Sequence, residues 1–336
     1  MKSRTGPIKL SLVLPVFNES LVLPATYESL RESFNPNEST RCEFIFVDDG
    51  SDDNSSEIIR DWINRDSRVR LVKLSRNFGH QAALDAGLSA ASGDVVGVLD
   101  ADLQDPPHVI LEMLSLWREG YDVVFGVREA RKEGLLKRVA YASFYRLWRR
   151  LAAIDVPLDS GDFCLIDRKV LEEINRLPEA NRFFRGLRSW AGFRQVGLPY
   201  ERALRARGES KYSFRALVNL SLDGLIDFSV SPLKLISLVG LLLSGGAFLG
   251  LILLLVQRII GFSIFGSYPE DVPGWTSIAV AILLICGVQL LATGVLGLYI
   301  GRTYQEAKAR PSFVVETVYG FDNTEWDGDG KESTLN

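Results

Sequence analysis

Two aspartates, Asp100 and Asp102, directly follow the apolar run Val95–Leu99. A run of small and β-branched apolar residues is typical of a buried parallel strand, and open α/β sheets bind their ligands at the carboxyl ends of such strands. Because residues i and i+2 of a strand point to the same side, both carboxylates can face one crevice. Carboxylates this close repel each other, and they suit Mg²⁺ or Mn²⁺ bridged to substrate phosphates. The pair therefore indicates a metal site.

Helix capping is the alternative role for the same acidic residues. A helix is expected after Pro106 and Pro107, and Asp102 or Asp105 stands where its N-terminus would be capped. An Asp-x-Asp pair alone does not separate the two interpretations. The metal site therefore depends on what the other strands bring to it.

Strands and helices are expected to alternate over the first 125 residues. The expected strands are 10–16, 44–47, 69–74, 95–99 and 121–125, and the expected helices are 20–34, 53–65, 81–91 and 108–118. This alternation predicts a mostly parallel sheet with right-handed crossovers.

Polar loops follow four of the expected strands. They are Asn18–Glu19, Asp48–Asp49, Arg76–Asn77 and Asp100–Gln104. In a parallel sheet all four belong at the same edge, which predicts a nucleotide site there. The glycine pattern of dinucleotide-binding folds does not follow the first strand, and Gly-Lys-Ser/Thr does not occur, which excludes a P-loop.

The same loops carry a resemblance to a known family. The segments Leu14–Glu19, Val47–Ser51, Arg76–Gly79 and Asp100–Gln104 resemble, in this order, the motifs of family-two glycosyltransferases of the GT-A fold. The resemblance implies an α/β, Rossmann-like nucleotide-sugar-binding domain. Over residues 8–310 the chain resembles enzymes that charge polyprenyl phosphates, namely dolichyl-phosphate mannose synthase and, more closely, bacterial undecaprenyl-phosphate glycosyltransferases with a two-span tail.

The resemblance implies roles for the residues of these loops. Asp102 and Gln104 would bind the metal, with Asp100 on the ribose or the metal, and both aspartates would serve catalysis. The nucleotide base and ribose of the donor would be held by Pro15, Val16, Asn18, Glu19 and Asp48.

Asp162 has two open interpretations. An acidic stretch before a strand is often only a turn, but in the resembled family this place lies beside the sugar and the acceptor. Asp162 is then a candidate for catalysis or sugar contact. A phosphate acceptor is largely ionised at neutral pH, so a strong general base is less necessary than with a hydroxyl acceptor.

A basic loop, Arg205–Tyr212, combines the groups of a phosphate clamp: guanidinium forks, a glycine and a hydroxyl donor. Without context it is a basic turn. It matches the Arg-x-x-Gly-x-Ser-Lys pattern of enzymes that charge polyprenyl phosphates, and the resemblance points to Arg205, Ser210 and Lys211. Arg128 and Arg131 resemble further phosphate contacts.

Membrane attachment is expected in the last third of the chain. Residues 213–231 suggest an amphipathic helix at a membrane surface, with a core helix as the alternative. Leu235–Val256 and Ile278–Ile300 carry no charge and are each long enough to cross a bilayer. Basic residues flank both spans on the outer sides of the hairpin, so the positive-inside rule places both chain ends in the cytoplasm.

The expected organisation has four parts: a GT-A catalytic domain (1–212), juxtamembrane amphipathic helices (213–232), a two-helix transmembrane hairpin (233–302) and a cytoplasmic C-terminal tail (303–336). Three scattered cysteines show neither a disulfide framework nor a metal-binding spacing, and residues 1–7 lack the apolar stretch of a signal peptide. These features fit an integral protein of the bacterial cytoplasmic membrane.

The resemblance implies an inverting transfer of a hexose, expected to be glucose from UDP-glucose, onto undecaprenyl phosphate, with Mg²⁺ or Mn²⁺. The alternatives are a mannosyl or amino-sugar transferase and an inactive membrane-anchored scaffold that binds nucleotide-sugar. A processive polysaccharide synthase is disfavoured because the chain lacks Gln-x-x-Arg-Trp and further spans. Two spans do not readily build a transporter. Glycines in the first span could also let helices of two copies pack closely, which leaves a homo-oligomer open.

Overall fold

The computed structural model describes residues 4, 6–34, 40–128, 160–179, 182–201, 231–260 and 274–321. These residues fall into two compact units. One unit contains two long helices, and the other contains the remaining described helices and strands, including residues 309–321 near the C-terminus.

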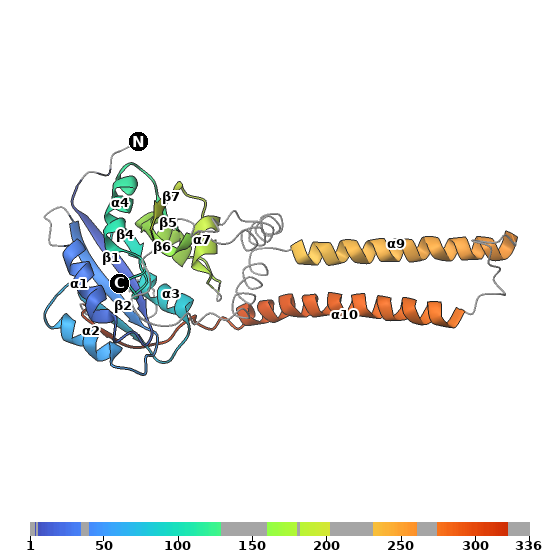
Figure 1. Ribbon diagram of the computed structural model, residues 1–336, viewed down its shortest axis with the longest axis horizontal. Helices are drawn as coiled ribbons and strands as arrows, with labels where there is room; N and C mark the ends of the chain where they lie inside the picture. The colour runs from blue at the N-terminus through green and yellow to red at the C-terminus, as the bar shows by residue number, and fades with distance from the viewer. Residues whose placement is uncertain are drawn as a thin grey trace, which may run out of the picture. The chain divides into compact units, whose positions relative to one another are not determined.

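An eight-stranded sheet forms the centre of the larger unit (Figure 1). Its strands are β1 (Ile8–Val16), β2 (Thr40–Asp48), β3 (Val69–Leu74), β4 (Val95–Val98), β5 (Val123–Arg128), β6 (Ser160–Asp167), β7 (Gln195–Tyr200) and β8 (Val315–Tyr319), in the order β7-β5-β6-β4-β1-β2-β3-β8. Four of the ladders, β1–β2, β1–β4, β2–β3 and β5–β7, are parallel. The expectation of a mostly parallel α/β sheet is therefore confirmed.

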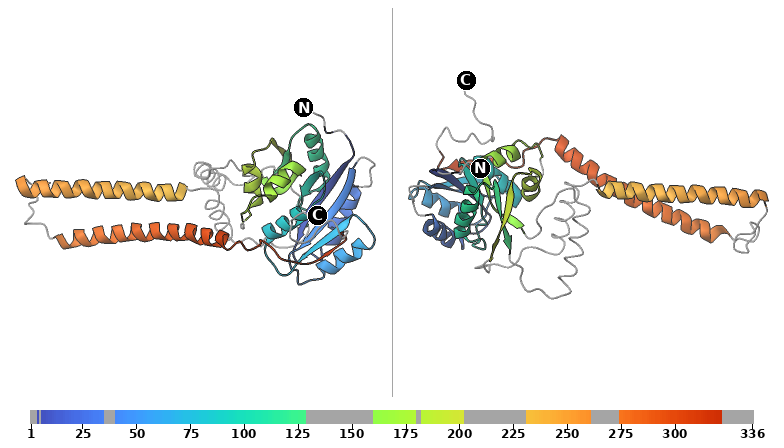
Figure 2. Two further views of the ribbon diagram at one scale, coloured as in Figure 1. Left: turned by 180° about the vertical axis from the view of Figure 1, so that it is seen from behind. Right: turned by 90° about the horizontal axis from the view of Figure 1, so that it is seen from above.

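Helices cover both faces of this sheet (Figures 1 and 2). They are α1 (Leu23–Ser33), α2 (Ser55–Ile63), α3 (His80–Ala90), α4 (Pro107–Arg118), α6 (Arg168–Asn175) and α7 (Phe184–Trp190). Successive residues of β1 point to opposite layers. Leu12 and Leu14 join the core with Ile59 and Ile110, whereas Val13 faces α3, where a Cβ on Gly87 would collide with it. Small residues in α3 thus let that helix lie close to β1.

Two antiparallel strands depart from the alternation expected from the sequence. Strand β6 enters between β4 and β5 and runs antiparallel to both. Strand β8 pairs antiparallel with β3 at the edge of the sheet. Part of the segment predicted as a C-terminal tail, residues 315–319, is therefore a strand of the same sheet that begins at Ile8.

The second unit contains α9 (Ser231–Ile260) and α10 (Gly274–Ala307), which contact each other. Each contains one of the two predicted spans. By length and hydropathy, one helical segment among the described residues, Ile285–Ala307, is suited to cross a membrane. The two-span hairpin thus stays a prediction. The amphipathic helix predicted over 213–231 lies, except for Ser231, outside the described residues.

Candidate active site

The loops after β1 and β2 are joined by hydrogen bonds at the carboxyl ends of the strands. Asn18, which has a φ of 54°, donates its backbone N–H to Ser51 Oγ (3.0 Å), and its Oδ1 accepts the N–H of Asp52 (2.9 Å). The buried carboxylate of Asp48 accepts the N–H of Ser51 (2.9 Å) and the hydroxyl of Ser56. Asp48 therefore shapes the loop in which a ribose contact was predicted.

The loop after β3 is joined through Asp49 to the loops that follow β1 and β2. This buried carboxylate accepts the backbone N–H groups of Phe78 (2.7 Å) and Gly79 (2.9 Å). Burial raises the pKa of Asp49, and these two hydrogen bonds oppose the shift. Gly50 has a φ of 68°, and a Cβ there would lie 2.5 Å from the backbone of Arg76. Glycine thus permits the two loops to meet.

Three aspartates gather in the loop after β4. Asp102 Oδ1 accepts the N–H of Gln104 (3.1 Å), and Asp105 Oδ1 accepts the hydroxyl of Tyr200 (2.6 Å). Asp102 and Asp105 are both buried. The N-cap residue of α4 is Pro106, which makes no side-chain cap hydrogen bond. The hydrogen bonds of Asp102 and Asp105 thus close a local turn and hold the end of β7.

Asp162 lies in strand β6, so the interpretation of this residue as part of a turn is wrong. Val98 of β4 pairs with Cys164 of β6. Asp100 lies two residues after Val98 and Asp162 two residues before Cys164, and the two carboxylates are close enough for their charges to interact. Strand β6, which was not expected between β4 and β5, therefore adds Asp162 to the aspartates of the loop after β4.

The pKa of Asp100 is raised to about 6. Burial is the largest cause, and the negative charges of Asp105, Asp102 and Asp162 add to it, while His80 opposes it. An ionised Asp100 is therefore stabilised by an added cation, which is what a metal-phosphate site requires.

The pKa of Asp162 moves in the opposite direction. Burial alone would raise it, but the hydrogen bond from His80 and the charges of Arg185, His80 and Arg188 hold it well below its usual range. Asp162 is thus ionised at any physiological pH. Two facing carboxylates with displaced pKa values are typical of functional sites.

Arg128, at the end of β5, supplies positive charge to the cluster. Burial lowers the pKa of its guanidinium, but a hydrogen bond to Tyr200 and the charges of Asp105 and Asp100 raise it overall. A Cβ on Gly161 would come within 2.9 Å of Arg128 Nη2. Glycine at this position therefore leaves room for the arginine, which was predicted as a phosphate contact.

The residues present fit a divalent ion that is held mainly by substrate. Among the described residues, no group of three or more His, Cys, Asp or Glu side chains is arranged to hold a metal. Mg²⁺ and Mn²⁺ sites of phosphate-transferring enzymes commonly use one or two carboxylates, with phosphate oxygens and water as the other ligands. Asp100 has three neighbouring carboxylates, those of Asp102, Asp105 and Asp162, and can supply the one or two that such a site needs.

Comparison with known proteins agrees with this geometry. The model of glycosyl transferase family 2 matches residues 11–175. An uncharacterized glycosyltransferase of Bacillus subtilis is 46% identical over 317 residues, which cover 94% of this chain and 96% of that protein. The chain belongs to glycosyl transferase family 2. Its α/β sheet is the GT-A fold expected from the sequence.

Two further similarities extend the comparison. A bactoprenol glucosyl transferase of Shigella phage SfV is 39% identical over 310 residues, which cover 92% of this chain and 98% of that protein. A solved mannosyltransferase of Pyrobaculum calidifontis, in complex with GDP-Man and Mn²⁺, is 16% identical, with a TM-score of 0.47 over 90% of this chain and 88% of that one. The second likeness is too distant to carry a conclusion.

The described residues bring most of the predicted site together. Strand β1 ends with Pro15 and Val16, and β2 ends with Asp48. The strand-end loops contain Asn18, Glu19, Asp100, Asp102 and Gln104, while Asp162 and Arg128 lie on β6 and β5. Arg131, Arg205, Ser210 and Lys211 lie outside the described residues.

Sequence reasoning missed the residues that surround Asp162 and Asp105. They are His80, Gln81, Arg185 and Tyr200. A signal existed for His80, which directly follows the polar loop Arg76–Gly79. The others stand on helix or strand positions with no local chemical pattern, and only the fold brings them to the site.

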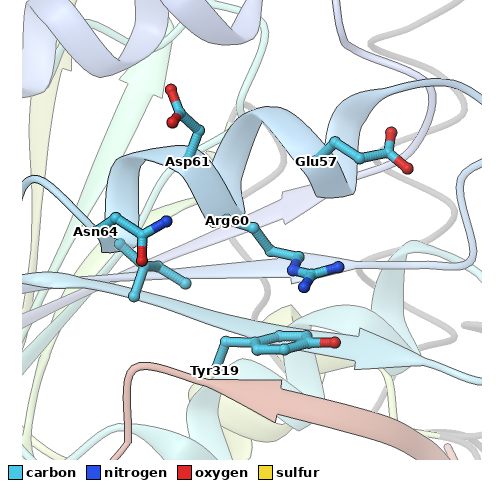
Figure 3. Close-up of a pocket in the computed structure, with 6 residues that line it drawn as sticks. Glu57, Arg60, Asp61, Asn64 and Tyr319 are labelled. Carbon is cyan, nitrogen blue, oxygen red and sulfur yellow. The ribbon is translucent and has the colours of Figure 1, made fainter.

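A surface hollow of about 340 Å³ lies elsewhere, between α2 and β8 (Figure 3). In it the guanidinium of Arg60 lies 4.6 Å from the ring centre of Tyr319. Tyr319 pairs with Leu71, in the first half of β3, and the neighbouring Gly320 lies against Val69. The hollow is thus at the amino end of that strand and does not belong to the candidate site.

Proposed function

We propose that this protein is an inverting hexosyltransferase that moves glucose from UDP-glucose onto the phosphate of undecaprenyl phosphate. The observation that carries the proposal is the carboxylate cluster of Asp100, Asp102 and Asp162 at the sheet edge of a family 2 chain. Bactoprenol glucosyl transferases similar over nearly the whole chain support the choice of acceptor and sugar.

The reaction is a direct displacement. A phosphate oxygen of the acceptor forms a bond to the anomeric carbon, the bond from that carbon to the donor phosphate breaks, and the nucleoside diphosphate leaves. The acceptor phosphate is largely ionised at neutral pH, because its second pKa is near 6, so it attacks without a strong base. Inversion follows from attack opposite the leaving group.

Each group of residues has a proposed task in that displacement. Asp102, Gln104 and Asp100 would hold the Mg²⁺ or Mn²⁺, which when bound neutralises charge on the leaving diphosphate. Residues Pro15 to Glu19 and Asp48 would hold the base and ribose. The proposed phosphate contacts are Arg128, Arg131, Arg205, Ser210 and Lys211.

The proposed location is the cytoplasmic face of a bacterial membrane, where a soluble nucleotide-sugar meets a lipid phosphate. The apolar segment Ile285–Ala307 supports attachment to a bilayer. Both chain ends would lie on the cytoplasmic side, with α9 and α10 as the two spans.

The test uses the purified full-length protein in nanodiscs with undecaprenyl phosphate and a panel of UDP- and GDP-sugars. We expect a glucosylated lipid phosphate from UDP-glucose, of inverted anomeric configuration by NMR, and no product after stringent chelation. Product from GDP-mannose or a UDP-amino sugar alone would overturn the sugar assignment. Undiminished product after chelation would overturn the metal, and release of UDP without glycolipid would overturn the acceptor.

A further inference from the structure

Asp162 is contacted by three donors from two helices. Its Oδ2 lies 3.1 Å from Gln81 Nε2 and 3.4 Å from His80 Nε2, and its Oδ1 lies 3.1 Å from Arg185 Nε. His80 and Gln81 begin α3, and Arg185 belongs to α7. Both oxygens of this carboxylate therefore already face protein donors.

Gln81 fixes the spacing of the two helices that carry these cations. Its Oε1 accepts the backbone N–H of Phe184, the first residue of α7, at 3.0 Å, while its Nε2 donates to Asp162. His80 and Arg185 are thus held on either side of one carboxylate by a continuous set of contacts.

The two cations are more accessible than the carboxylate between them. The side chain of Asp162 is 10% exposed, against 40% for His80 and 27% for Arg185. His80 also lies close enough to Asp100 for their charges to interact. His80 and Arg185 therefore place two basic side chains, both partly exposed to solvent, next to the metal-binding loop.

We propose that Asp162 is a clamp for His80 and Arg185, and that this cationic pair binds the phosphate of the lipid acceptor. The inference rests on the proposed function and deepens it. Asp162 then acts as a positioning residue and not as the proton acceptor, and His80 and Arg185 touch substrate. A carboxylate engaged on both oxygens by cations is a poor base, and an ionised phosphate does not need one.

The chain contains two histidines, His80 and His108, which supplies a matched control. His108 is exposed on α4. We expect His80→Gln to raise the KM for undecaprenyl phosphate at least 10-fold, with the affinity for UDP-glucose changed less than twofold, and His108→Gln to match wild type. We expect Asp162→Asn to raise the same KM, and the double variant with His80→Gln to add little, because both changes disrupt one binding unit.

A spectroscopic readout makes the test independent of turnover. In the untagged full-length His108→Gln protein, His80 is the single histidine, so its ring protons are assigned without ambiguity. We expect inorganic phosphate and undecaprenyl phosphate each to shift these signals, and Arg185→Gln or Asp162→Asn to weaken the response. Circular dichroism of each variant checks that it is folded.

Three outcomes would overturn the inference. They are a kcat that collapses in Asp162→Asn with an unchanged acceptor KM, an acceptor KM for His80→Gln equal to wild type, and histidine signals that phosphate does not shift. Failure of the proposed function is distinguishable, because it is read from the wild-type protein. If wild type forms no glycolipid, the NMR titration with inorganic phosphate still decides whether His80 and Arg185 bind a phosphate group.

Discussion

Asp100, in the loop after β4, and Asp162, on β6, are the same type of side chain in different surroundings. Burial, with the nearby charges of Asp105, Asp102 and Asp162, raises the pKa of Asp100 to about 6, so an added cation stabilises its ionised form. Burial would also raise the pKa of Asp162, but His80, Arg185 and Arg188 lower it overall. The difference between the two carboxylates therefore comes from their charged neighbours.

Replacing Asp102 with Asn tests the proposed role of this single residue as a metal ligand. We expect kcat/KM for glycolipid formation to fall at least about 100-fold, or about 2.7 kcal/mol, because a neutral amide binds Mg²⁺ or Mn²⁺ weakly. The fold is expected to survive, since the amide oxygen can still accept the N–H of Gln104. Steady-state kinetics and the thermal midpoint measure the two effects.

Asp61, exposed on α2 at the hollow that does not belong to the site, provides the matched control for that substitution. Asp61→Asn is expected to behave as wild type in both measurements. Full turnover by Asp102→Asn at saturating Mn²⁺ would contradict the metal role of Asp102.

Individual site residues were predictable where a strand end and a polar loop coincide in the sequence. Asp100 and Asp102 follow an apolar run directly, so their position at the sheet edge could be read from the local pattern. Asp105 meets Tyr200, 95 residues away, and Asp162 meets Gln81, 81 residues away. Such contacts depend on the pairing of β4, β5 and β6, which no local pattern specifies.

Among the elements, the segment after α10 is attached to the larger unit by more than strand pairing. Ser312 donates its hydroxyl to Asp85 Oδ2 (2.6 Å), and Arg182 Nε lies 3.1 Å from the other oxygen of the same buried carboxylate. Asp85 belongs to α3, the helix that begins with His80. Residues near the C-terminus therefore support the helix that carries part of the site.

Ser312→Ala is expected to lower the free energy of unfolding by about 1–3 kcal/mol, because it removes a hydrogen-bond donor from a buried carboxylate. Glu316→Gln is the contrasting change, since Glu316 is half exposed and pairs with Lys73 on the surface. Its cost should be below about 1 kcal/mol. Denaturant titration compares the two, and equal losses would show that Ser312 contributes only as a surface residue.

Glu43 joins several strands near the amino ends of the sheet. It accepts hydrogen bonds from Ser11 and Ser92 and lies 3.2 Å from Arg70 Nε. Burial alone would raise the pKa of Glu43, but these hydrogen bonds and the charge of Arg70 lower it below the usual 4.5. The stabilisation is therefore present above pH 4.5 and is lost as the pH falls through the lower folded-state value.

Glu43→Gln is expected to reduce stability by about 2 kcal/mol at pH 7 and to flatten the loss of stability below pH 4.5. Denaturation at a series of pH values between 3 and 7 measures the slope. Glu28→Gln, at an exposed pair on α1, should leave the wild-type slope intact. An unchanged slope in Glu43→Gln would assign the acid sensitivity to other carboxylates.

The elements themselves were predictable to different degrees. The strands β1 to β4 are apolar runs separated by helical periodicity, and their parallel order follows from that alternation. Strand β8 is only five residues long and pairs with β3 from more than 240 residues away. Its β-branched and aromatic residues, without regular alternation, were a weak signal at the end of a segment that otherwise suggested a tail.

For the whole molecule, the course of the chain constrains how it can cross a membrane. The chain leaves the larger unit before α9 and returns to it at β8, which pairs with β3. If the protein is attached to a bilayer as proposed, both connections lie on one side of it, and the number of crossings between them is even. In the proposed hairpin, a crossing by the apolar segment Ile285–Ala307 is then matched by a crossing of α9.

Thiol labelling of intact cells tests this arrangement. In a Cys286→Ala background, we expect Ser267→Cys, between the two helices, to react with an impermeant maleimide added outside the cytoplasmic membrane. Ser333→Cys, after β8, should react only once the membrane is opened. Labelling of both positions from outside would contradict the even number of crossings.

The return of the chain to the sheet at β8 also means that the two long helices do not depend on a single covalent connection. A protease cut between residues 261 and 273 would produce two fragments, of which the earlier contains α9 and the later contains α10 and β8. The later fragment would keep its β8 ladder and its Ser312–Asp85 hydrogen bond with the earlier one. Two separately synthesised halves of this transferase should therefore reassemble into one working enzyme.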